Sequence, residues 1–200
     1  PPGALGPPRR ETAMGHRLSK IYTRTGDEGT TGLGDGARVK KFAPRVHALG
    51  DVDELNTTIG LLLAEPLSSP LAERLLEIQH DLFDLGGELS IPGMTLLPAD
   101  AITRLEAHID EYNESLPPLK EFILPSGSRR VASCHFARAV CRRVERTVVE
   151  LADSEPVSET VLRYLNRLSD LLFVLARHLA REELGKEVMW DRSRFARSDD

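Results

Sequence analysis

Five segments of this 200-residue chain repeat apolar residues at spacings of three and four, and this pattern constrains the fold more than any other feature. Such spacing places the apolar side chains on one face of an α-helix, and several such faces pack into a bundle. Four of the expected helices cover about 44–64, 70–89, 102–112 and 131–151. The fifth has its apolar positions between 161 and 179 and ends at Gly185. We therefore predict an all-α fold, an antiparallel bundle of four to five helices. Short extended runs are expected only at 20–23 and 121–124.

Charge and cysteine usage limit the partners and the compartment. The net charge of −5 argues against a nucleic acid or an anionic membrane covering the whole surface. No apolar run reaches the roughly 18 to 20 residues of a membrane span. Cys134 and Cys141 are seven residues apart in a helical segment, so roughly 10 Å separates them, which is too far for a disulfide. We predict a cytoplasmic protein with no nucleic-acid or membrane partner.

The composition also suggests how the chain is divided. Residues 1–19 begin with a proline- and glycine-rich stretch without periodicity and are interpreted as a disordered leader or extension, with Met14 a candidate start. Residues 20–192 are expected to form one helical-bundle domain, of which 20–43 is an N-terminal arm. Residues 193–200 are expected to be a C-terminal tail.

The arm contains the stretch IYTRTGDEGTTGLGDG, residues 21–36, which is interpreted as neither strand nor helix. Glycines let backbone N–H groups approach phosphate oxygens, and threonine hydroxyls add donors. Arg24, Lys40 and Lys41 supply positive charge, while Asp27 and Glu28 are candidates for contact with Mg²⁺ or a ribose. Neither the P-loop nor the Rossmann motif is present. A phosphate-binding loop and a flexible entry arm both remain open.

The fourth helical segment is rich in arginine. Arg138, Arg142 and Glu145 fall on one face, and Arg143 and Arg146 form a neighbouring stripe. Four arginines within nine residues repel one another unless an anion or acidic side chains balance them, and arginine binds phosphate in a bidentate manner. The pattern fits either an anion site or a solvated face paired with acids from another helix.

Two further polar residues interrupt apolar seams. Asn166 lies in the middle of the fifth segment, where asparagine is a poor helix former, and therefore needs a partner from a neighbouring helix or a ligand. Asp53 lies on the seam of the first segment and is expected to meet an arginine such as Arg138 across a helix or subunit interface.

Five motifs occur in order along residues 20–192: KIYTRTGDEGTTGLGDG, VDELN, FILPSGS, ARAVCRRVER and NRLSDLLF. Together they resemble the PduO-type ATP:cob(I)alamin adenosyltransferases, also called corrinoid adenosyltransferases. The resemblance implies a homotrimer of five-helix bundles with active sites between subunits. It also implies transfer of the 5′-deoxyadenosyl group of ATP to cob(I)alamin, with Mg²⁺ assistance and release of triphosphate. A corrinoid reductase and a B12-dependent acceptor enzyme are the expected protein partners.

The resemblance also assigns roles to residues. Phe122 would lie at the lower face of the corrin, Phe173 would form a second apolar wall, and Asp53 and Arg138 would form an intersubunit salt bridge. Arg142, Asn166 and Phe122 are the expected catalytic residues, and Mg²⁺ would be held through ATP with no protein ligand assigned. The expected ATP-binding residues are Thr23, Arg24, Thr25, Gly26, Asp27, Gly29, Thr31, Lys41, Arg142, Arg143, Glu145, Arg146 and Asn166.

Two other functions compete with this interpretation. One is a nucleotide- or corrinoid-binding carrier without turnover, and the other is a structural helical oligomer whose arginines form interface pairs. An arm of this composition together with Asn166 favours the enzyme, because an oligomerisation unit needs neither.

Overall fold

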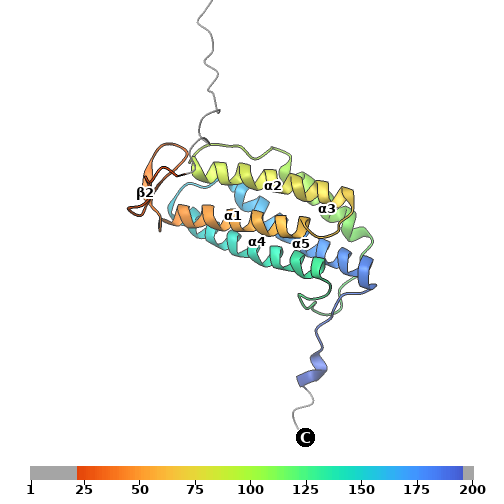
Figure 1. The fold of residues 1–200 in the computed structure, drawn as a ribbon. Helices are drawn as coiled ribbons and strands as arrows, with labels where there is room; N and C mark the ends of the chain where they lie inside the picture. Colours follow the sequence, from red (N-terminus) through yellow and green to blue (C-terminus); the bar gives the residue numbers. More distant parts are fainter. Residues whose placement is uncertain (1–21, 196–200) are drawn as a thin grey trace, which may run out of the picture.

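A computed structural model describes residues 22–195 as a bundle of five α-helices with a small hairpin at one end (Figure 1). This confirms the predicted all-α bundle. Residues 1–21, which include the whole of the expected leader, lie outside the described part, as do residues 196–200. The helices are α1 (Pro44–Leu63), α2 (Ser69–Ser90), α3 (Ala101–Glu114), α4 (Arg129–Ser154) and α5 (Glu159–Leu184).

Local sequence signals explain where the helices begin and end. Proline stands in the first turn of α1 and α2, where its missing N–H costs nothing. Ser128 and Ser158 cap α4 and α5, since each hydroxyl accepts a hydrogen bond from a backbone N–H of the first turn. Gly185 ends α5 in the left-handed conformation, with a φ of 72°.

The core lies between the apolar faces of the helices. Helix α4 packs against α1 and α5, α2 packs against α1, and α3 packs against α5. Cys134 and Cys141 are both buried and reduced, and burial raises the pKa of the Cys134 thiol to about 12. No helix within residues 22–195 is long and apolar enough to cross a membrane.

The hairpin corrects one prediction. Strand β1 (Thr30–Gly32) lies within the stretch that was interpreted as neither strand nor helix, and it pairs antiparallel with β2 (Arg38–Lys40). The turn is made by Asp35 and Gly36: the Asp35 carboxylate accepts from the Ala37 N–H at 2.8 Å, and Gly36 has a φ of 89°. An Asp-Gly pair between two runs that favour strands is a hairpin signal.

The two expected extended runs also differ from the prediction. Tyr22 and Thr23 are not in a strand, and residues 20 and 21 lie outside the described part. Within 121–124 there is one isolated bridge, from Ile123 to Met189, flanked by backbone bonds between Leu124 and Val188 and between Trp190 and Phe122. These bonds attach the segment that follows α5 to the loop that precedes α4.

Candidate nucleotide and corrinoid site

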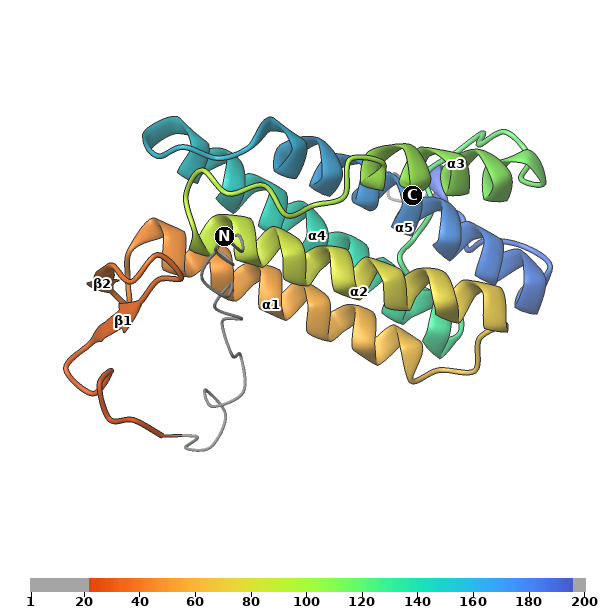
Figure 2. The same cartoon turned by 90° about the horizontal axis from the view of Figure 1, so that it is seen from above.

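A contact between the hairpin and the end of α2 attaches the arm to the bundle. The Gly34 N–H lies 2.8 Å from the Ser90 hydroxyl and 3.0 Å from the Ser90 carbonyl oxygen, at the end of α2. A Cβ atom on Gly34 would lie 2.5 Å from Cγ1 of Ile91, so glycine is required for this approach. Figure 2 shows the hairpin beside the first turn of α1 and the end of α2.

The predicted ATP-binding residues of the arm lie close to one another. The hydroxyls of Thr23 and Thr25 are 2.9 Å apart, and Arg24 adopts a positive φ of 60°. The Lys41 ammonium lies next to Gly26, because a Cβ atom placed on Gly26 would be only 3.3 Å from Nζ of Lys41. The lysine side chain therefore lies against the backbone of this loop. Gly29 has a φ of 77°, and its carbonyl accepts from the Lys41 N–H. Asp27 is exposed in the same turn, and Thr31 lies in β1.

The sequence analysis missed Arg38, whose side chain forms hydrogen bonds with this loop. Its guanidinium donates to the Thr30 hydroxyl at 2.6 Å and to the Thr25 carbonyl. A single arginine in a short strand carries no helical periodicity, so only recognition of the Asp35-Gly36 hairpin would have placed it opposite Gly32, two residues from Thr30.

The arginine run of α4 is divided between two environments. Arg143 forms an ion pair with Glu54 of α1, and the hydrogen bond from Arg143 lowers the pKa of the Glu54 carboxyl. Arg142 and Arg146 are exposed, and within residues 22–195 neither forms an ion pair with a carboxylate. Among the described residues, Arg146 donates only to the Arg142 carbonyl, at 2.9 Å. Two guanidinium groups are thus free to meet an anion.

Asn166 has the neighbouring-helix partner that its position required, although it is exposed rather than buried. Its amide nitrogen donates to the Glu145 carboxylate at 2.9 Å, which joins α5 to α4. Its carbonyl oxygen accepts from Arg167, which also donates to Glu106 of α3. Glu145 and Asn166 therefore present one fixed polar pair beside Arg142.

The two predicted corrinoid residues line one hollow of about 440 Å³. Phe122 is 70% exposed, and its ring meets Trp190 edge-on, with the ring centroids 6.2 Å apart. Phe173 of α5 lies beneath the Arg138 guanidinium, whose carbon is 5.8 Å from the ring centroid. Nε of Arg138 is buried and has no hydrogen-bond partner within residues 22–195. The hollow therefore combines two apolar walls with an incompletely satisfied cation.

Asp53 is exposed on α1 and makes no ion pair with Arg138 in the described part of this single chain. The predicted salt bridge was between subunits, so it stays a prediction.

His135 adjoins this hollow through Arg138, one turn away on α4. Burial, and then the Arg138 charge, lowers the pKa of His135 from 6.5 to about 4. Between those values the unfolded chain binds a proton that the folded chain does not, so this stabilising contribution is present above pH 6.5 and is lost as the pH falls.

We predict that His135→Leu flattens the acid side of the stability profile. From pH 6.5 down to 4 the wild-type free energy of unfolding should fall more steeply than that of the variant, by up to one proton, or about 1.4 kcal/mol per pH unit. Urea titrations at half-unit pH steps measure both slopes. Parallel slopes for the two proteins would contradict the assignment.

Taken together, the fold and the site define a class of protein: a helical bundle that carries a glycine-rich hairpin arm, exposed arginines and an aromatic hollow. The family described as cobalamin adenosyltransferase matches residues 21–179 of this sequence. A cobalamin adenosyltransferase of Cupriavidus metallidurans is 61% identical over 182 residues, which cover 90% of this chain and 99% of that relative. A corrinoid adenosyltransferase of Bacillus subtilis is 48% identical, covering 87% of this chain and 93% of its own length.

A solved structure agrees with the sequence relatives. A variant PduO-type ATP:corrinoid adenosyltransferase from Lactobacillus reuteri, complexed with cobalamin and ATP, superposes with a TM-score of 0.82 at 35% identity. The match covers 86% of this chain and all of that one. The chain belongs to the cobalamin adenosyltransferase family, and it is an enzyme of the transferase class.

Proposed function

We propose that this protein transfers the 5′-deoxyadenosyl group of ATP to cob(I)alamin, giving adenosylcobalamin and triphosphate. One observation carries the proposal: the free arginines continue directly from the aromatic hollow along α4. Arg138 lines the hollow, and Arg142 follows four residues later on the same face, a rise of roughly 6 Å. A planar apolar substrate against Phe122 and Phe173 and a polyphosphate on Arg142 and Arg146 would therefore be neighbours.

The chemistry explains why the site needs no nucleophilic side chain. Co(I) attacks C5′ of ATP with its own electron pair, the bond from C5′ to oxygen breaks, and its electrons leave with the triphosphate. The protein aligns cobalt with C5′ and stabilises the departing negative charge. Arg142 and Arg146 suit the second task, and the Glu145–Asn166 pair suits the positioning of the nucleoside.

Phe122 would act on the reduction that precedes transfer. An apolar ring against the lower face of the corrin excludes water and the lower axial ligand, which makes Co(II) easier to reduce to Co(I). We predict that Phe122→Ala slows turnover from Co(II) and weakens the four-coordinate Co(II) signal in electron paramagnetic resonance, while turnover from chemically prepared Co(I) falls less. Full activity from Co(II) with an unchanged signal would remove Phe122 from this role.

The arm and the hollow suggest that the active site forms between subunits. The arm adjoins the first turn of α1, whereas the loop with Phe122 lies at the opposite end of the bundle (Figures 1 and 2). Helix α1 has 20 residues and is thus roughly 30 Å long. In a homotrimer, the arm of one copy would reach the arginines of its neighbour, and Asp53 of one copy would pair with Arg138 of the next.

Mg²⁺ would enter this site with ATP. Within residues 22–195 no group of three His, Cys, Asp or Glu side chains is arranged to hold a metal ion. Mg²⁺ commonly binds through substrate phosphates and only one or two carboxylates, and Asp27 and Glu28 are exposed candidates in the arm. A cytoplasmic location, a corrinoid reductase and a B12-dependent acceptor enzyme remain part of the proposal.

The first test is an anaerobic assay with chemically reduced cob(I)alamin, ATP and Mg²⁺. Loss of the Co(I) absorbance, with formation of light-sensitive adenosylcobalamin and free triphosphate, would support the transferase. Binding of ATP and corrinoid without product would favour the carrier instead. Absence of any thermal stabilisation by ATP would favour the structural oligomer.

The contact between Gly34 and Ser90 gives a prediction about the arm. Gly34→Val places a side chain against Ile91 and breaks both hydrogen bonds to Ser90. We expect the KM for ATP to rise about 5- to 150-fold because the two lost bonds together are worth about 1–3 kcal/mol, while the KM for the corrinoid changes little. Gly32→Ala is the control, since a Cβ there meets nothing within 4 Å. Equal KM values for the two variants would contradict the docking role.

A further inference from the structure

A buried ion pair joins α5 to the segment that follows it. Nε of Arg177 donates to the Glu187 carboxylate at 2.9 Å, and both residues are only 5% exposed. Arg181 forms an ion pair with the second oxygen of the same carboxylate, at 2.7 Å. The Arg177 guanidinium also donates to the Pro117 carbonyl at 2.6 Å, at the start of the loop that leads to Phe122. Arg177 therefore contacts both chain segments that meet at the aromatic hollow.

Beyond this junction the two segments form a short antiparallel ladder, between residues 122–124 and 188–190. The ladder has one bridge and a backbone hydrogen bond on either side of it. Side chains alternate between the two faces of a strand, so a slip of one residue would turn Trp190 away from the Phe122 ring that it meets edge-on. A ladder this short is not stable by itself, so a contact outside it must hold the register. Glu187, directly before the paired residues, makes that contact.

The ion pair is suited to fixing one position of the segment. Moving two charges out of water offsets most of their attraction, so an apolar pair of the same size would stabilise the fold about as well. Removing one partner, in contrast, leaves an uncompensated buried charge, which is strongly unfavourable. The pair therefore favours the position in which Glu187 reaches both Arg177 and Arg181 over every other position of the segment.

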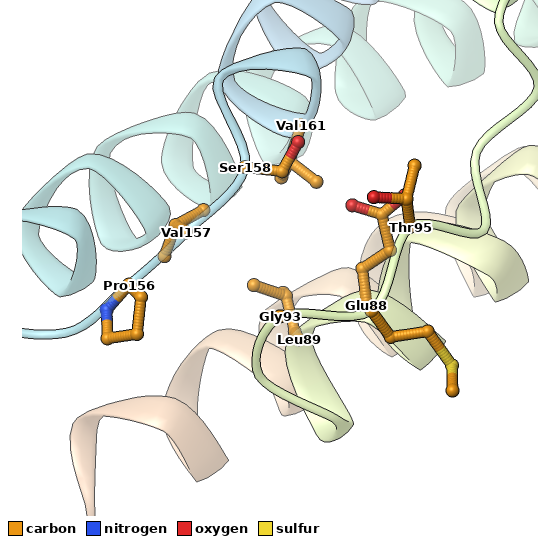
Figure 3. A pocket seen from close by; sticks show the side chains of 9 residues that line it. Glu88, Leu89, Gly93, Thr95, Pro156, Val157, Ser158 and Val161 are labelled. Carbon is orange, nitrogen blue, oxygen red and sulfur yellow. The ribbon is translucent and has the colours of Figure 1, made fainter.

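A second buried carboxylate holds a loop that is remote from the hollow. Glu88, also 5% exposed, accepts from the Leu96 and Leu97 N–H groups, both at 2.8 Å, and so fixes the loop between α2 and α3. In Figure 3 it faces Ser158 across a cavity between the end of α2 and the start of α5. Glu187 follows the other end of α5. Glu88 thus offers a comparison that is equal in burial and different in place.

We propose that Arg177 and Glu187 are positioning residues for the corrinoid: they hold residues 186–192 on the loop before α4 in the register that sets the Phe122 ring at the hollow. The inference rests on the proposed function, because the corrinoid is the ligand that the hollow would receive. Both residues act through Phe122 rather than by touching the corrinoid. When the pair is broken, fewer molecules have a formed hollow, and the apparent affinity for the corrinoid falls by the same fraction.

Glu187→Gln tests the proposal, and Glu88→Gln is the matched control, since both replace an equally buried carboxylate by an amide of the same shape. With chemically prepared cob(I)alamin, Glu187→Gln should raise the KM for the corrinoid about 10-fold, as expected if about one molecule in ten keeps the segment in place. The kcat and the KM for ATP should change little. The four-coordinate Co(II) signal should weaken, as in Phe122→Ala. Glu88→Gln should change neither the corrinoid KM nor the signal.

Two outcomes of this comparison would overturn the proposal. One is a corrinoid KM of Glu187→Gln equal to that of the wild type, and the other is an equal rise in Glu88→Gln, which would make the effect a general result of losing a buried charge. Wild-type protein that forms no adenosylcobalamin would instead refute the proposed function. An active wild type with an unaffected Glu187→Gln variant would refute only the positioning role.

A double variant separates positioning from stability. If Glu187 acts through the Phe122 ring, Phe122→Ala/Glu187→Gln should weaken the Co(II) signal no more than Phe122→Ala does alone. Additive losses would contradict the proposal. Arg181→Gln removes one of the two donors to Glu187 at a partly exposed position, so it decides the question even if Glu187→Gln does not fold. It should raise the corrinoid KM by a smaller factor, and no rise would overturn the proposal.

Discussion

Arg142→Ala is expected to lower kcat for adenosyl transfer about 30- to 1000-fold, because removing one preorganised donor from a developing negative charge costs about 2–4 kcal/mol. Arg142 is exposed on α4, and within residues 22–195 it has no carboxylate partner, so its charge is available to the departing triphosphate. The KM for the corrinoid should change little because the hollow is left intact. Single-turnover measurements with cob(I)alamin separate this step from product release.

Two controls make the result specific. Arg142→Lys keeps the charge but loses the bidentate geometry, and we expect it to recover only part of the rate. Arg163→Ala removes another exposed arginine, on α5, and should be neutral. Turnover of Arg142→Ala within threefold of wild type would exclude Arg142 from the site.

Arg45→Ala is expected to have the largest effect on stability, about 2–4 kcal/mol. Arg45 is 3% exposed and joins three segments. Its guanidinium donates to the Glu155 carboxylate at 2.7 Å, to the Leu89 carbonyl at 2.8 Å and to the Pro156 carbonyl at 3.1 Å. Alanine would leave these acceptors without a donor and open a void in the end of the bundle. Urea unfolding at fixed protein concentration, with an unchanged m value, measures the loss.

Glu155→Gln is the informative comparison for Arg45. The Glu155 side chain is 37% exposed, so water can solvate it, and its loss should cost about 1 kcal/mol or less. A similar destabilisation in both variants would mean that the ion pair, rather than the two backbone contacts, accounts for the effect of Arg45.

The helices were predictable because their signals are local and repeated. The spacing of three and four along α5, the prolines at the start of α1 and α2, and Gly185 each specify helix or boundary without reference to the rest of the chain. The hairpin was missed because each of its strands has three residues, too few for periodicity to appear. Only the Asp35-Gly36 turn marked it.

The site was predictable in parts. The sequence indicated that Arg138 and Arg142 share a face, because that follows from helical geometry alone. The placement of Phe122 and Phe173 around one hollow depends on the path of the loop before α4, which no spacing rule gives. Arg45 and Glu88 were overlooked, although both interrupt buried stripes: Arg45 precedes Ala48 and Val52 at spacings of three and four, and Glu88 follows Leu85 by three. A charge at an apolar position of the repeat was the signal.

The contact between Trp190 and Phe122 gives the molecule an intrinsic optical probe. Trp190 is the only tryptophan of the chain, so its emission arises from one place, the edge of the aromatic hollow. A bound corrin absorbs light and would quench that emission by energy transfer, whereas a nucleotide bound at the arm would leave it nearly unchanged. Corrinoid occupancy can thus be followed by fluorescence titration, without a dye and without waiting for turnover.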